Sequence, residues 1–233
     1  MPMIMVNDIR MHYEITGKGD PILLIAGFST DITHYSKIIK ELSLRYKVIA
    51  FDNRGAGRTD KPDKPYTIET MANDAITLLK KLRINRVNLL GFSMGGQIAM
   101  TFAIKYPKNT KNLILVSTMA GPIPQTFSWR LINSLLEIPV IRKMSSKYPQ
   151  PYYAVKRQAF AAKTFDARRT LHKIKAPTII LHGSWDSIVP HRFAKKMHSQ
   201  IRNSRMITFD AGHLFLFFRH EQFIQIINDF LSR

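Results

Sequence analysis

Short apolar runs alternate with helical patterns along most of the chain, and this alternation constrains the fold more than any other feature. Runs of strand length are found at Ile22–Ala26, Tyr46–Phe51, Val87–Phe92, Leu113–Ser117, Thr178–Leu181 and Arg205–Phe209. Helical spacing is found at Ile32–Leu44, Thr67–Arg83, Gly95–Lys105, Arg192–Gln200 and in the C-terminal segment. Two further strands, Ile4–Val6 and Ile9–Ile15, flank Asn7-Asp8 as an opening hairpin. The pattern predicts an α/β fold with a mostly parallel sheet and helices on both faces.

Residues 119–176 interrupt the alternation, because they contain no convincing strand and are rich in proline. Short helices are expected at Trp129–Glu137, Val140–Ser146 and Ala154–Lys163. We therefore expect a core formed by residues 1–118 and 177–233, with residues 119–176 as a short helical lid inserted after the sixth strand.

The positive charge is concentrated in the middle of the chain. The formal net charge is +19, and residues 75–176 carry 18 lysines and arginines against two acidic residues. Such an excess is either generic surface charge or a sign of an acidic partner. No recognition-helix or base-stacking motif accompanies it, so specific nucleic-acid binding is not expected.

The composition also limits the chemistry. The absence of cysteine excludes disulfides and thiol catalysis. No His, Asp or Glu cluster has metal-ligand spacing, so neither a metal nor another cofactor is expected. The uncharged stretch Val87–Ile104 contains polar residues and glycines, which favours a buried strand and helix over a membrane span. The N-terminal residues lack a signal-peptide pattern, and a cytoplasmic location is the expectation.

A G-x-S-x-G motif stands where an apolar strand turns into a helix, at Gly91-Phe92-Ser93-Met94-Gly95. This is the context in which a serine is held out of the sheet as a nucleophile. The glycines permit the tight turn, and the helix N-terminus favours a developing anion. Ser93 is therefore the candidate nucleophile.

A serine nucleophile needs a base, and the base needs an acid that orients it. Asp186 follows the strand Thr178–Leu181, and His213 follows Arg205–Phe209. Both lie just past strand ends, in the chain order serine, acid, histidine. His182 is expected to be structural and Asp210 too close in sequence to bond His213 well. The remaining histidines, His12 among them, are expected at the surface.

Two backbone N–H groups are expected to form an oxyanion hole. Met94, directly after the serine, would supply one, and Phe28, in the loop after Ile22–Ala26, would supply the other. An apolar acyl pocket is expected from large side chains near these motifs, with the Phe28 and Met94 side chains as walls. Its other candidate residues are Phe92, Met119, Trp129, Ile188 and Leu214.

The ordered motifs resemble those of the α/β-hydrolase family, and the likeness covers nearly the whole chain. Five segments carry it: Ala26-Gly27-Phe28, the loop Asp52–Thr59, Gly91–Gly96, Ala176–Pro190 and Ala211-Gly212-His213. Ala26 stands where the family often has a histidine that orders the oxyanion loop, and Phe92 where a histidine often precedes the nucleophile. The lid is also short for the family.

The resemblance implies a serine hydrolase that cleaves a carboxylic ester through an acyl-enzyme on Ser93. Lactonase, thioesterase and C–C bond hydrolase reactions use the same constellation and stay open, as does a noncatalytic ligand receptor on this scaffold. One similar branch, the esterases of pimeloyl-acyl carrier protein methyl ester, uses basic lid residues to hold an acidic carrier. An ester carried on an acidic acyl carrier protein is therefore a possible substrate beside a small-molecule ester.

Overall fold

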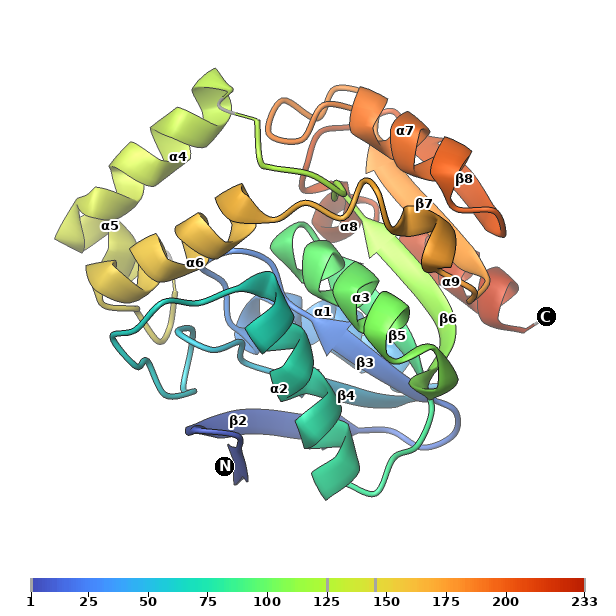
Figure 1. The fold of residues 1–233 in the computed structure, drawn as a ribbon, viewed down its shortest axis with the longest axis horizontal. Coiled ribbons are helices and arrows are strands. Elements are labelled where there is room, and N and C mark those ends of the chain that lie inside the picture. The colour runs from blue at the N-terminus through green and yellow to red at the C-terminus, as the bar shows by residue number, and fades with distance from the viewer. Residues whose placement is uncertain (1, 125, 145, 233) are drawn as a thin grey trace.

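Eight strands form one sheet in the computed structural model, which describes residues 2–124, 126–144 and 146–232 (Figure 1). The strands are β1 (Met3–Val6), β2 (Ile9–Thr16), β3 (Pro21–Ile25), β4 (Lys47–Phe51), β5 (Val87–Phe92), β6 (Thr110–Val116), β7 (Thr178–Gly183) and β8 (Ser204–Phe209). Their order is β1-β2-β4-β3-β5-β6-β7-β8, and only the pairs β1/β2 and β2/β4 are antiparallel. The expected mostly parallel sheet with an opening hairpin is confirmed.

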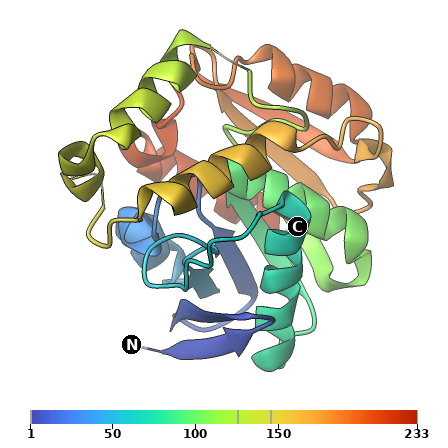
Figure 2. The same ribbon diagram turned by 60° about the vertical axis from the view of Figure 1, so that its left-hand side comes forward.

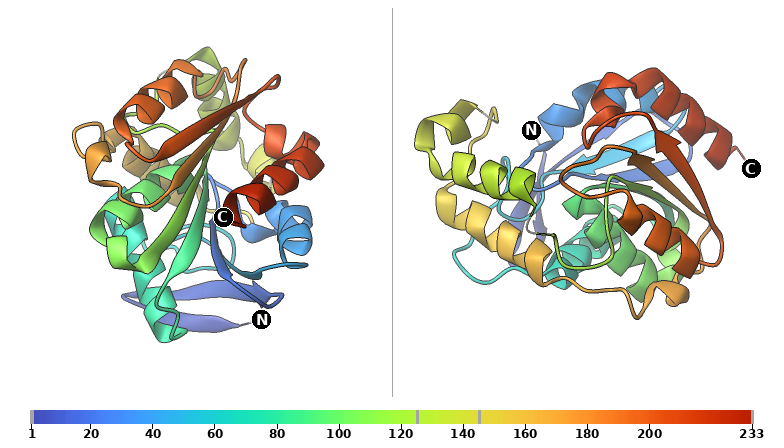
Figure 3. Two further views of the ribbon diagram at one scale, coloured as in Figure 1. Left: turned by 90° about the vertical axis from the view of Figure 1, so that its right-hand side faces the viewer. Right: turned by 90° about the horizontal axis from the view of Figure 1, so that it is seen from above.

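Helices cover both faces of the sheet, as its apolar strands require. One layer consists of α2 (Ile68–Lys81), α3 (Met94–Lys105) and α7 (Arg192–Gln200), and the other of α1 (Ser36–Leu42), α8 (Phe215–Phe218) and α9 (His220–Leu231). Successive strand residues point to opposite faces, so Leu23 joins the first layer and Leu24 the second. Figure 3 shows the two layers on either side of the sheet.

The helix expected over Ile32–Leu44 is divided in two. Asp31 caps a short 3₁₀ turn, η1 (Ile32–Tyr35), by accepting a hydrogen bond from the Thr33 N–H, and α1 begins only after it. Side-chain capping of this kind lets the backbone turn before a regular helix starts. The other 3₁₀ turns are η2 (Pro107–Asn109) and η3 (Leu171–Lys173).

Three helices separate β6 from β7: α4 (Phe127–Glu137), α5 (Pro139–Met144) and α6 (Tyr152–Thr164). Of the helix expected at Val140–Ser146, α5 accounts for the first part, and Ser145 lies outside the described residues. We call residues 119–176 the insertion. Figure 1 places its helices at the left of the molecule, and Figure 2 shows α6 crossing the core with α4 and α5 at the outer edge.

Candidate active site

Ser93 lies in a strained turn between β5 and α3. Its φ is +53°, in the left-handed region that a non-glycine residue seldom adopts. The turn is possible because its flanks have no side chain: a Cβ on Gly95 would lie 2.1 Å from the Ile25 carbonyl oxygen, and one on Gly91 would lie 2.4 Å from that of Gly95. The chain holds Ser93 at the carboxyl edge of the sheet, and Ser93 is only partly buried there.

The structure brings Ser93, His213 and Asp186 into one hydrogen-bonded line. His213 Nε2 lies 3.2 Å from Ser93 Oγ, and His213 Nδ1 lies 2.7 Å from Asp186 Oδ2. The residues come from the ends of β5, β7 and β8, which meet at the same edge because these strands run parallel. This geometry allows the imidazole to accept the serine proton while the carboxylate fixes its orientation.

Asp186 is buried and held by more partners than the sequence indicated. Its Oδ1 accepts hydrogen bonds from the N–H groups of Ile188 and Val189, at 3.0 and 2.8 Å. His182, also buried, has its Nε2 3.4 Å from Oδ2 and donates a 2.7 Å hydrogen bond to the Val189 carbonyl. Burial raises the pKa of Asp186, but the hydrogen bonds from His182, His213 and Val189 outweigh it and bring that pKa to about 2. His182 is structural as expected, and its contact with Asp186 was not foreseen.

The loop that carries His213 is fixed on two sides. Ser117 donates a 2.9 Å hydrogen bond from its Oγ to the His213 carbonyl, and the Phe92 ring packs 5.2 Å from the imidazole. Phe92 in turn contacts the rings of Tyr35 and Phe217. An apolar floor therefore supports the imidazole.

Asp210 does not reach His213. Its carboxylate accepts hydrogen bonds from Trp185 Nε1, at 2.6 Å, and from Ser184 Oγ instead. The expectation that Asp210 is too close in sequence to bond His213 well is confirmed, and Asp186 is the acid that meets the imidazole.

The expected oxyanion donors lie at the start of α3 and in the loop after β3. Met94 is the first residue of α3, where a backbone N–H has no intrahelical partner. The Phe28 N–H has no hydrogen-bond acceptor among the described residues. Both N–H groups are thus free to bind a substrate oxygen.

The Phe28 loop is held by hydrogen bonds from several other segments. Asn53 Nδ2 donates to the Ala26 carbonyl at 2.9 Å, and the Gly27 N–H donates to Tyr35 Oη at 2.9 Å. From α6, the fully buried Gln158 accepts from the Ser29 N–H at 3.0 Å and donates to the Arg54 carbonyl at 2.7 Å. The loop needs such support, because Ser29 has a φ of +56°.

The expected pocket residues fall into three environments. Trp129 of α4 packs its ring 5.1 Å from that of Phe28, beside the oxyanion loop. Met94 and Met119 are buried in the apolar layer over α2 and α3. Ile188 is half-buried next to Asp186, whereas Leu214 is exposed beside His213. Their roles in substrate binding stay predictions.

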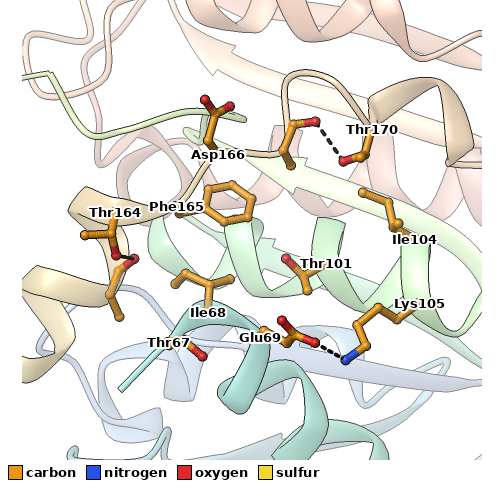
Figure 4. A pocket seen from close by; sticks show the side chains of 12 residues that line it. Thr67, Ile68, Glu69, Thr101, Ile104, Lys105, Thr164, Phe165, Asp166 and Thr170 are labelled. Carbon is orange, nitrogen blue, oxygen red and sulfur yellow. Dashed lines mark hydrogen bonds and ion pairs between the residues drawn. The ribbon is translucent and has the colours of Figure 1, made fainter. Parts of the chain in front are cut away.

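A cavity of about 480 Å³ lies elsewhere, between the start of α2, the end of α3 and the segment after α6 (Figure 4). No residue of the Ser93–His213–Asp186 line contributes to it. The charged groups that line it are already paired, Glu69 with Lys105 and Asp166 with Arg168. We therefore assign it no part in the chemistry at Ser93.

The surface position expected for His12 is wrong. The side chain is fully buried, with Nδ1 3.4 Å from the carboxylate of Asp52. Asp52 also accepts hydrogen bonds from the N–H groups of Ile32 and Arg58 and so anchors the loop that follows β4. His12 is buried because β2 lies inside the sheet next to β4, a pairing that its own sequence did not reveal.

In residues 2–124, 126–144 and 146–232, no group of three or more His, Asp or Glu side chains is arranged to hold a metal ion. Within the same ranges, no helix combines the length and the apolar character needed to cross a bilayer.

Comparison with known proteins adds a family and several relatives. The family model described as "alpha/beta hydrolase fold" matches residues 20–136. The human protein "Serine hydrolase BPHL" is 28% identical over 254 residues, covering 98% of this chain and 85% of its own. An esterase from Exiguobacterium antarcticum superposes with a TM-score of 0.88 at 26% identity, covering 99% of each chain. The enol-lactonase from Burkholderia xenovorans LB400 gives 0.85 at 25% identity, covering both chains completely.

Proposed function

Because this chain belongs to the alpha/beta hydrolase fold family, we propose that it is a serine hydrolase that cleaves carboxylic esters through an acyl-enzyme on Ser93. The observation that carries the proposal is the hydrogen-bonded line from Ser93 Oγ through His213 to Asp186. It begins at a strained turn and ends on a buried carboxylate, which is the arrangement that activates a serine.

In the proposed mechanism, Ser93 Oγ attacks the ester carbonyl while His213 Nε2 takes its proton. The N–H groups of Phe28 and Met94 bind the oxygen that becomes negative. His213 then returns the proton to the leaving alcohol, and water hydrolyses the acyl-enzyme by the same steps. Asp186 stays ionised and stabilises the imidazolium, in keeping with its low pKa.

We assign Gln158 the role of positioning the oxyanion hole. It bridges the Ser29 N–H, next to the Phe28 donor, and the Arg54 carbonyl. A hole donor is effective only when it is held before the charge develops. Gln158 belongs to the insertion, so residues 119–176 are proposed to act both as a lid and as part of the support for the hole.

The identity of the bond that is cleaved is supported less specifically than the catalytic residues are. The relatives named above include an esterase and an enol-lactonase, and both reactions transfer an acyl group to water. Thioester and C–C bond cleavage would use the same residues. A small-molecule ester is the proposed substrate. The comparisons do not support an acyl carrier protein as its carrier, and that partner stays a prediction from the basic insertion.

The test compares the wild type with Ser93→Ala and His213→Ala on a panel of nitrophenyl esters, lactones and thioesters of varied acyl length. Either substitution should lower kcat by about 10⁴-fold or more while the fold is retained. Preference for lactones or thioesters over open esters would change the substrate class but keep the mechanism. Near-normal hydrolysis by either variant would contradict the catalytic assignment. No hydrolysis of any member of the panel by the wild type would favour a noncatalytic receptor.

A further inference from the structure

The outer side of α4 is apolar although it faces solvent. Phe127 is 80% exposed, and Leu131 and Leu135 follow at intervals of four residues on the same side of the helix. On the opposite side, Trp129 and Leu136 are buried. The inner side therefore already meets the packing requirement of the helix, whereas the outer apolar side chains stay exposed, at 80% for Phe127, 47% for Leu131 and 38% for Leu135.

The exposed apolar side chains continue past the end of α4. Ile138 and Val140, at the junction with α5, are also exposed. We call these five residues the α4 strip: Phe127, Leu131, Leu135, Ile138 and Val140. The described residues include 14 large apolar side chains that are exposed, and five of them lie between positions 127 and 140. Such concentration, unlike scattered exposed residues, marks an interaction surface.

The strip lies on the part of the molecule that projects farthest from the core. Figures 1 and 2 show α4 and α5 at the outer edge, with α6 between them and the core helices. The view from above in Figure 3 agrees. A flat partner could therefore reach the strip without meeting the rest of the protein.

The surroundings of the strip are positively charged. Arg130 on α4 and Lys143 on α5 are exposed, and neither forms an ion pair with a carboxylate in the described part of the chain. Glu137 is the only acidic residue between positions 75 and 165, and it accepts a hydrogen bond from Tyr152. The cations are thus left available to an external anion.

We propose that the α4 strip and its flanking cations dock on the surface of an anionic lipid bilayer. A helix with apolar side chains on one side and cations beside them lies in the interfacial plane, with its apolar side at the boundary of headgroups and acyl chains. The cations then meet anionic headgroups. A second copy of the chain fits less well, because a symmetric contact would bring the same cations together.

The α4 strip lies on one side of α4, and the side that faces the site at Ser93 is the opposite one. Trp129, on the inner side of the same helix, contacts the ring of Phe28 in the candidate oxyanion loop. Docking would therefore place a helix that contacts the candidate oxyanion loop against the bilayer. The inference does not depend on the reaction proposed above, since it rests on exposure and charge alone.

The experiment measures flotation of the full chain with phosphatidylcholine vesicles that contain phosphatidylglycerol, against vesicles of phosphatidylcholine alone. We expect preferential binding to the anionic vesicles, weakened by added salt. Arg130→Gln with Lys143→Gln should weaken binding about five-fold per cation removed. Phe127→Ser with Leu131→Ser should weaken it at least about ten-fold. Leu44→Ser is the matched control, because Leu44 is 82% exposed but lies in the turn after α1.

Thermal unfolding of each variant checks that the fold is kept, and Phe127→Ser alone is the milder substitute if the double variant is unstable. Equal or absent binding of the wild type to the two vesicle types would overturn the proposal, whatever the variants do. Equal effects of Leu44→Ser and the strip variants would also overturn it. A concentration-dependent dimer, seen by sedimentation and abolished by Phe127→Ser, would assign the strip to a second copy of the chain instead.

Discussion

Replacing Gln158 with leucine tests whether the insertion takes part in catalysis. Leucine is close to glutamine in size but makes no hydrogen bonds, so the variant leaves the Ser29 N–H and the Arg54 carbonyl without their partner. In the wild type these two bonds measure 3.0 and 2.7 Å, and Gln158 itself has no solvent-exposed surface. The Arg54 carbonyl is therefore shielded from water, whereas the Ser29 N–H belongs to a half-buried residue.

Two separate effects follow from the loss. Each buried polar group left unpaired costs about 1–3 kcal/mol, so the loss of both hydrogen bonds should lower the free energy of unfolding by about 2–6 kcal/mol. The second effect acts on the reaction. A complete loss of one oxyanion donor would cost about 10²–10³-fold in kcat, and a donor that is only displaced should cost less. We expect kcat to fall about 10- to 100-fold with KM changed by less than about three-fold, since the donor acts mainly on the transition state.

The assay combines steady-state kinetics on the best nitrophenyl ester with inhibition by a trifluoromethyl ketone, whose adduct with the serine carries an oxyanion. The inhibition constant should rise in parallel with the loss of kcat, whereas inhibition by the product acid should not change. Phe160→Ser is the matched control, because Phe160 is on the same helix but exposed. A variant that is less stable yet has normal kcat and normal ketone inhibition would show that Gln158 only anchors α6, which refutes the reasoning.

Three further outcomes are expected. Gly95→Ala should abolish activity and lower the yield of folded protein, because the added Cβ would lie 2.1 Å from the Ile25 carbonyl oxygen; circular dichroism and ester hydrolysis check this. Asp186 has a pKa of about 2 when folded, so it contributes about 2 kcal/mol of stability above pH 4, and this is lost as the pH falls from about 4 to 2. In urea unfolding, the stability of Asp186→Asn should fall less than that of the wild type as the pH is lowered from about 4 to 2. Finally, Trp129→Ala should raise KM for long acyl esters more than for acetyl esters if the ring beside Phe28 contacts the acyl chain.

The sequence predicted the parts of the structure that follow from local pattern and chain order. The apolar runs around Leu24 and Leu90 had strand length, and strand–helix alternation leaves few ways to arrange such runs. Parallel strands bring their carboxyl ends to one edge, so the positions of Ser93, Asp186 and His213 after successive strands were enough to place them together. Short-range rules and topology sufficed for these features.

Features that depend on long-range packing could not be predicted. The burial of His12 follows from the pairing of β2 with β4, which no pattern within either strand encodes. The contact of His182 with Asp186 depends on the path of the loop after β7, where the chain turns back on itself. In both cases the environment of the histidine is formed by other segments of the chain. How these segments approach the histidine depends on the tertiary fold and not on the local sequence.

The burial of Gln158 could have been predicted from the sequence, whereas its hydrogen-bond partners could not. On α6 it occupies the buried side with Ala154, Val155, Ala161 and Ala162, so it is the one polar residue in an otherwise apolar stripe. A buried amide must have partners, and this requirement predicts two polar groups opposite it. The sequence cannot say which groups these are, because Ser29 and Arg54 are 129 and 104 residues away. Ala26 indicates which loop could be the partner. An oxyanion loop without the histidine often found at this position needs support from outside the loop, and a buried amide on the neighbouring helix can provide it. If Gln158→Leu lowers kcat as expected, the insertion helps to hold the oxyanion loop through the hydrogen bonds of Gln158 to Ser29 and Arg54.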